Sequence, residues 1–174
     1  MSAEEGRTYF GKYRGRVFNN VDPLNIGRLQ VQVPDVSGLN VSNWAMPCLP
    51  FTGLQSGFYL VPPVNAGVWV EFEQGEIDHP IWTGCWWGGR EEVPVLAQAP
   101  VVPPQQNIVL QTAGGHVVSI NDQKGSPVSG IVLRTPGGAM IQVSDTGITI
   151  TNGAAKISLI GNAVSINGTG LVVT

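Results

Sequence analysis

The sequence predicts an all-β protein in two parts, a small closed barrel followed by a β-solenoid or β-prism built by more than one chain. The composition is the first reason: 23 glycines and 13 prolines accompany only 12% charged and 43% apolar residues, which is rich in turns and not disordered. Short apolar-polar alternations along the chain are the second reason, and an internal repeat in the second half is the third.

Five strands are expected in the first part, which we place at residues 1–90. They cover residues 13–18, 27–33, 44–50, 67–73 and 80–86. The intervening segments are rich in Gly, Pro and Asn, so we expect loops there, including a long one at 51–63, and no helix. Five short antiparallel strands suit a small closed barrel such as the OB-fold. Residues 91–107 contain four prolines and are expected to form an extended linker.

The second part, residues 108–174, begins with a repeat. Residues 109–115 (VLQTAGG) match 132–138 (VLRTPGG), and apolar-x-apolar doublets then recur every seven residues, once every nine. Turn dipeptides such as Asn152-Gly153 and Asn167-Gly168 separate the doublets. This pattern predicts very short strands that bury one face.

The doublets are the expected core of the second part. They include Ile141, Val143, Ile148, Ile150, Ile157, Leu159, Val164 and Ile166. A narrow ribbon made by one chain would leave its apolar face half exposed to water, whereas several copies around one axis would bury every doublet. The pattern therefore favours an assembly of more than one chain.

Charge and targeting signals exclude several classes of protein. The net charge of −3 argues against a general nucleic-acid binder, which needs a basic surface. The acidic start shows no signal peptide, and no run of apolar residues is long enough to span a membrane. We expect Cys48 and Cys85 to be buried free thiols, although a disulfide between them stays possible, and they form no zinc site with the two histidines.

Few residues are candidates for chemistry, and no cofactor is expected. Four carboxylates gather near the end of the fourth strand: Glu71, Glu73, Glu76 and Asp78. Paired carboxylates can catalyse hydrolysis, but a solvated strand edge and turn explains them better. His79 and His116 are expected in turns or on the surface.

Aromatic residues offer a second candidate site, since OB-folds can stack single-stranded bases on such rings. Trp69 and Trp82 lie in alternating strands and are expected in the barrel core. Trp86 and Trp87 are neighbours and cannot both point inward, so one of them is expected to be exposed or at a protein interface.

Four motifs in the first part carry a resemblance to a known family. They are 27–34 (GRLQVQVP), 44–47 (WAMP), 62–75 (PPVNAGVWVEFEQG) and 80–84 (PIWTG). In this order and spacing they resemble the OB-fold domain of contractile-tail central spikes, the phage baseplate assembly protein V family and the spike part of VgrG proteins of type VI secretion. The repeat at 108–174 is similar to the trimeric β-helix of the same family.

The resemblance implies a structural, non-enzymatic homotrimer that pierces membranes, with a barrel collar and an intertwined needle. The doublets would then be the trimer core. The barrel end would bind a baseplate hub protein, and Leu171, Val172, Val173 and Thr174 would dock a separate PAAR-type tip protein. Such a protein would be assembled in the bacterial cytoplasm into a phage, bacteriocin or secretion-system particle and would contact the target membrane transiently, without binding nucleic acid.

The chain departs from some family members in two respects. It has no lysozyme insert between barrel and needle, and it lacks the His-x-His iron motif found at some spike apices. Three alternatives stay open from the residues alone: an OB-fold binder of single-stranded nucleic acid, a spike-associated cell-wall hydrolase, and a trimeric adhesin fibre.

Overall fold

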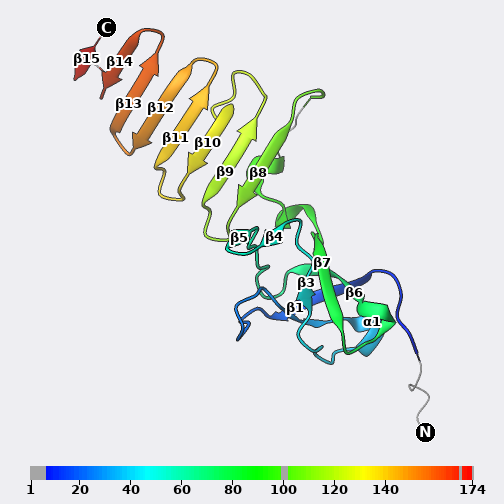
Figure 1. The fold of residues 1–174 in the computed structure, drawn as a ribbon. Coiled ribbons are helices and arrows are strands. Elements are labelled where there is room, and N and C mark those ends of the chain that lie inside the picture. Colours follow the sequence, from blue (N-terminus) through cyan, green and yellow to red (C-terminus); the bar gives the residue numbers. More distant parts are fainter. Residues whose placement is uncertain (1–6, 99–101, 169, 174) are drawn as a thin grey trace. The chain divides into compact units, whose positions relative to one another are not determined.

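The computed structural model describes residues 7–98, 102–168 and 170–173, shown in Figure 1. The chain divides into two compact units. Unit 1 ends at Gly89, and unit 2 begins at Arg90. Apart from four short helices, the regular structure of the described residues consists of strands, so the chain is all-β as the sequence predicts.

Unit 1 is a curled five-stranded sheet with the order β2-β1-β6-β7-β3. Its elements are β1 (Tyr13–Asn19), β2 (Gln30–Gln32), α1 (Pro34–Ser37), β3 (Met46–Pro47), β4 (Thr52–Gly53), β5 (Ser56–Gly57), β6 (Gly67–Phe72), η1 (Glu73–Gly75) and β7 (Pro80–Trp86). An antiparallel bridge between Leu29 and Ala45, just before β2 and β3, joins the two outer strands. The sheet thereby closes into the small barrel that the strand pattern predicts. The expectation that all five strands are antiparallel is wrong, since β3 pairs with β7 in parallel.

The barrel encloses a dry apolar core. Along β6 the alternation of a strand places Val68, Val70 and Phe72 inward. Leu29 from the segment before β2 is fully buried, and Trp82 of β7 donates its indole Nε1–H to the carbonyl oxygen of Gly27 at 3.0 Å. This core needs no other chain to exclude water from its side chains.

Several details of unit 1 differ from the sequence-based expectations. The helix α1 was not expected; it begins at Pro34, whose fixed φ suits the first position of a helix. The segment expected as a loop at 51–63 contains the hairpin β4–β5. Trp69 is half-buried on the outer face, because its neighbours Val68 and Val70 take the inward positions.

The two cysteines are free but not buried. Both Cys48 and Cys85 are exposed, so the expectation of buried thiols is wrong. Cys48 follows the two-residue strand β3, where the chain leaves the barrel, and Cys85 lies near the exposed end of β7.

Unit 2 is an eight-stranded antiparallel meander in which each strand pairs with its neighbours in sequence (Figure 1). Its elements are η2 (Arg90–Glu92), η3 (Val95–Gln98), β8 (Asn107–Gln111), β9 (Val117–Asn121), β10 (Gly130–Arg134), β11 (Met140–Ser144), β12 (Gly147–Asn152), β13 (Ala155–Ile160), β14 (Ala163–Ile166) and β15 (Leu171–Val173). The turns fall at the predicted dipeptides, and Asn167 and Gly168 both have the positive φ of a tight hairpin turn.

The segment expected as an extended linker contains the two 3-10 helices η2 and η3. The side chain of Gln98 folds back and donates to the carbonyl oxygens of Arg90 and Val93, which stabilises this turn-rich conformation. Asn107 at the start of β8 donates its amide to the carbonyl oxygen of Leu96 at 2.6 Å. These contacts attach the segment to unit 2.

Glycine is required where the doublet strand β12 starts. Gly147 has φ +145, and a Cβ at this position would overlap the carbonyl oxygen of Leu159 on the neighbouring strand β13. Gly130, at the start of β10, meets the carbonyl oxygen of Val143 in the same way. The glycine that precedes a doublet therefore allows adjacent strands to approach to pairing distance.

Candidate functional site

The apolar doublets of unit 2 form two unbroken ladders on one face of the sheet. One ladder runs through Leu110, Val118, Leu133, Ile141, Ile150, Ile157, Ile166 and Leu171. The other runs through Ile108, Ile120, Ile131, Val143, Ile148, Leu159, Val164 and Val173. Directly opposed side chains of this kind interact across strands. The structure thus brings all eight expected core residues together.

This face has no covering layer in a single chain. Apart from Ile148, which is half-buried, the described side chains of the ladders are between 38% (Ile157, Val164) and 60% (Leu110) exposed. A continuous aliphatic face of this extent exceeds what monomeric soluble proteins normally leave in water. Such a face is typical of a surface that packs against another protein surface.

The opposite face of the meander is mostly polar and better covered. Its central ladder includes Ser119, Val132, Thr149, Ser158 and Ser165. The hydroxyls of Ser158 and Ser165 lie 2.7 Å apart, and Val132 is fully buried. Side chains alternate between the two faces of a strand. The polar residues between the members of each doublet therefore lie on the face opposite the apolar ladders.

Gln142 lies on the same polar face and ties down the loop between β9 and β10. Its side-chain amide donates to the carbonyl oxygens of Pro127 and Ser129, at 3.2 and 2.9 Å. The loop carries Gly125 and Pro127, as the sequence predicts for the insertion between the two repeats.

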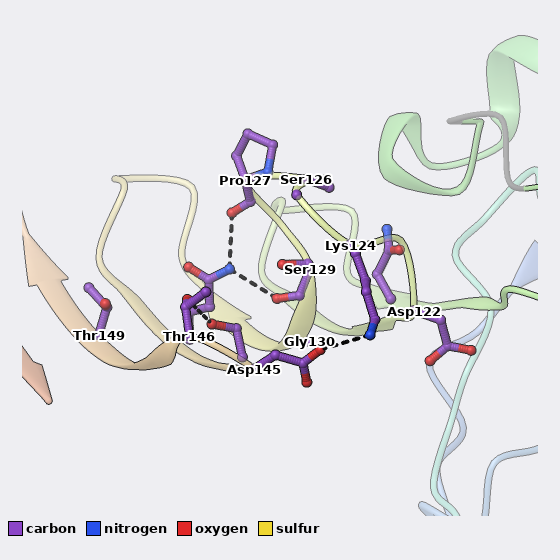
Figure 2. A pocket seen from close by; sticks show the side chains of 13 residues that line it. Asp122, Lys124, Ser126, Pro127, Ser129, Gly130, Asp145, Thr146 and Thr149 are labelled. Atoms are coloured by element: carbon purple, nitrogen blue, oxygen red, sulfur yellow. Dashed lines mark hydrogen bonds and ion pairs between the residues drawn. The ribbon is translucent and has the colours of Figure 1, made fainter. Parts of the chain in front are cut away.

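An open cavity of about 890 Å³ lies on the polar face, beside this loop (Figure 2). Hydroxyl, amide and backbone groups line it, and Lys124 forms an ion pair of 3.7 Å with Asp145. Both partners of the pair are more than 80% exposed, so the interaction contributes little to stability.

The carboxylates near the end of β6 are separate surface groups. Glu71 accepts a hydrogen bond from Lys12 Nζ at 2.6 Å, whereas Glu73, Glu76 and His79 belong to an exposed turn. His116 is exposed as well. Within the described residues, no group of three or more His, Cys, Asp or Glu side chains could hold a metal ion. None of the helices described has the length and apolar character that crossing a bilayer requires.

The outer face of the barrel carries a cation-aromatic cluster. The guanidinium of Arg14 lies 5.5 Å from the ring centre of Trp69 and 5.1 Å from that of Trp86. Trp86 also donates its indole N–H to the carbonyl oxygen of Val68, and Trp87 is 63% exposed. The prediction that one of Trp86 and Trp87 is exposed is confirmed. Both distances are those of cation–π contacts, so Arg14 packs against the two rings.

Asp22 organises the loop between β1 and β2. Its carboxylate accepts hydrogen bonds from the side chain of Arg28 and from the backbone N–H groups of Leu24, Ile26 and Arg28. Arg28 Nη2 approaches Asp22 Oδ1 to 2.7 Å, with only 3% of the Asp22 side chain exposed. The Arg28 guanidinium, followed by the backbone donors, holds the pKa of Asp22 well below its usual range.

The residues predicted to dock a tip protein lie at the far edge of the sheet. Leu171 is 54% exposed and pairs with Ile166 through β15, which is the edge strand of the described meander. The side chains of Val172 and Val173, and Thr174 as a whole, lie outside the described residues.

Sequence reasoning missed one further surface, the loop at residues 51–60. Phe51, Leu54, Phe58, Tyr59 and Leu60 are each more than half exposed, and Leu54 reaches 95%. The signal for it was present in the sequence: residues 36–70 contain no charged side chain, in a chain with 12% charged residues. An exposed apolar loop of this kind is typical of an interface.

Comparison with known proteins agrees with this architecture. Residues 13–87 match the family described as type VI secretion system/phage-baseplate injector OB domain. Residues 107–172 match the family described as phage baseplate V C-terminal trimerisation domain. No curated protein matches the sequence.

The two matches fall on the two units of the structure in order and leave only short segments uncovered. Both families consist of structural baseplate proteins and not of enzymes. The trimerisation domain supports a homotrimer, and the baseplate families suggest a component of a tail or baseplate. The chain belongs to the phage baseplate V and type VI secretion spike-like proteins.

Proposed function

We propose that this protein is the central spike of a contractile tail or injection system and that it acts mechanically, without catalysis. Three copies pack the apolar face of unit 2 around a common axis and form a rigid needle that pierces the target membrane, while unit 1 forms the collar. The ladder face carries this proposal, because two rows of aliphatic residues remain 38–60% exposed in one chain. The trimerisation family at residues 107–172 supports the number of copies.

The pairing of strands decides how such a needle would be held together. Every neighbouring pair from β8 to β15 forms its ladder within one chain. Association therefore relies on apolar packing between sheets more than on backbone hydrogen bonds between chains. Residues Ile141, Val143, Ile148, Ile150, Ile157, Leu159, Val164 and Ile166 form the trimer core in this proposal.

Light scattering on a sizing column tests the assembly. Three chains of 18.4 kDa give about 55 kDa, which we expect as the dominant species at micromolar concentration. A stable monomer under these conditions would contradict the needle, since an aliphatic face of this size would then be soluble without cover.

Both ends of the spike bind partners in this proposal. Unit 1 binds a baseplate hub protein, and Leu171 to Thr174 of the three chains form a platform for a separate PAAR-type tip protein. The exposed edge strand β15 supports the platform, because an open strand edge offers unpaired backbone groups for pairing. Deleting residues 171–174 should abolish co-purification with a PAAR-type protein of the same gene cluster and leave the trimer intact. Retained binding would place the platform elsewhere.

The absence of catalysis is tested separately. We expect no clearing in zymography against purified cell wall. Clearing that disappears in a Glu71→Gln or Glu73→Gln variant would show that the surface carboxylates are catalytic and would favour a cell-wall hydrolase instead.

A further inference from the structure

The apolar loop of unit 1, defined as residues 51–60, is built as an ordered hairpin. Phe58 N–H donates to the carbonyl oxygen of Phe51 at 3.0 Å, and β4 and β5 pair Thr52 with Gly57. At Gly57, with φ +147, a Cβ would lie 2.9 Å from the Phe51 carbonyl oxygen, so the close return of the chain depends on this glycine. The backbone of the loop therefore has a defined turn conformation.

This apolar loop approaches the loop between β1 and β2. A ring carbon of Tyr59 lies 3.8 Å from the position that a Cβ of Gly27 would occupy. The loop that contains Gly27 also carries Leu24 and Ile26, which are 62% and 46% exposed. Two loops distant in sequence thus come close at Tyr59 and Gly27, and both carry exposed apolar side chains.

The lack of charge points to the kind of partner. No charged residue occurs between positions 36 and 70, although the loops of a soluble protein are usually where charges gather. Interfaces between identical subunits are more apolar than transient interfaces, and their centres are depleted of charge. Around a threefold axis this depletion is favoured further, because any charge near the axis would face its own copies.

Because the two units belong to one chain, a trimer formed by unit 2 also brings three copies of unit 1 together. Unit 1 is followed directly by unit 2, whose trimerisation family implies three copies in one particle. Three tethered copies of unit 1 meet at an effective concentration on the order of millimolar, at which even a modest apolar surface associates.

We propose that residues 51–60 of each chain pack against unit 1 of a second copy of this chain and so form the contact that holds the collar together. This inference rests on the trimer of the proposed function and adds to it a second, independent interface. Leu54 at the tip of the hairpin inserts into the neighbouring copy, and Phe51, Phe58 and Leu60 surround it.

Hydrogen exchange of the full-length protein tests the contact. A two-stranded hairpin is only marginally stable by itself, so its amides exchange quickly unless another surface covers them. In the wild-type trimer we expect the amides of residues 51–60 to exchange at least about tenfold more slowly than in Leu54→Asp. Leu54 is 95% exposed within one chain, so the substitution leaves the barrel core untouched.

Leu39→Asp is the matched control, because Leu39 is 81% exposed in the same charge-free stretch but lies outside the hairpin. This variant should retain the wild-type protection of residues 51–60, and both variants should retain the trimer mass through unit 2. A wild-type trimer whose hairpin exchanges as fast as Leu54→Asp overturns the inference but not the proposed function. Protection that arises only after a hub protein is added also overturns it. A monomeric wild type overturns both.

Discussion

The two units of this chain bury their apolar residues in opposite ways. In unit 1 the strands close on themselves, and Val68 and Val70 have no contact with water. In unit 2 the strands form an open meander, and the comparable aliphatic residues Ile150 and Ile166 remain 42% and 38% exposed. The difference lies in topology and not in the amount of apolar side chain. A sheet that closes makes its own inside, whereas an open sheet with one apolar face needs another sheet to provide it.

The two units can be followed separately by spectroscopy. All five tryptophans lie before residue 90, so tryptophan fluorescence reports on unit 1 alone. Circular dichroism reports on the strands of both units. Each variant below can therefore be assigned to the unit that it affects.

The largest effect is expected from a charge on the ladder face. Ile150→Asp would place three carboxylates near the common axis, each unpaired among aliphatic residues, at a cost on the order of 3–5 kcal/mol per chain. Light scattering should show the trimer replaced by the 18.4 kDa monomer, while the fluorescence spectrum of unit 1 is retained. Ile160→Asp is the control, because Ile160 is 58% exposed on the other face. Equal disruption by both substitutions would refute the assignment of the faces.

A smaller effect is expected from crowding between strands. Gly147→Ala forces a methyl group onto the Leu159 carbonyl oxygen and should destabilise unit 2 by about 3 kcal/mol. Gly161→Ala, at φ +57 with open space around its Cβ position, should cost only about 1 kcal/mol. Thermal melting followed by circular dichroism compares the two variants. If they melt alike, adjacent strands do not approach as closely as the structure shows.

A core substitution in unit 1 tests whether the barrel can lose stability without a change in the assembly. Val70→Ala removes two buried methyl groups and should destabilise the barrel by about 2 kcal/mol without changing the mass of the assembly. Urea unfolding followed by tryptophan fluorescence measures this loss. Val21→Ala, at a side chain that is 76% exposed, should leave the midpoint nearly unchanged. A change of oligomeric state in Val70→Ala would show that the two units do not fold independently.

The variant with the smallest expected effect at neutral pH tests how acid affects the stability of unit 1. The pKa of Asp22 is lowered in the folded state, chiefly by Arg28, so its stabilising contribution is present above the unfolded pKa of about 4. It declines as the pH falls below that value, because the unfolded chain then binds a proton that the folded carboxylate does not, and it is lost once the pH passes the lowered folded pKa. Asp22→Asn should flatten the dependence of the unit 1 melting temperature on pH between about 4 and 2, whereas exposed Asp35→Asn should not. An unchanged pH profile in Asp22→Asn would contradict this role.

Sequence reasoning was most successful where local chemistry decides the outcome. The fifth strand was predicted at residues 80–86, and β7 covers Pro80–Trp86. The turns of unit 2 were predicted from Asn-Gly and related dipeptides, since few other residues adopt positive φ. The third strand was predicted too long, because only Met46–Pro47 finds a partner in β7. Its length depends on a pairing that the local sequence does not encode.

By itself the sequence determined the all-β class, the spacing of the doublets and the face that each doublet shares, because strand alternation and turn chemistry act within a few residues. The tertiary structure alone decided how Leu29 meets Ala45 to close the barrel, why Trp69 points outward, and how the doublets align into two ladders across eight strands. Closure and register are set by contacts between residues far apart in the chain, and a shift of one residue would turn every side chain to the other face.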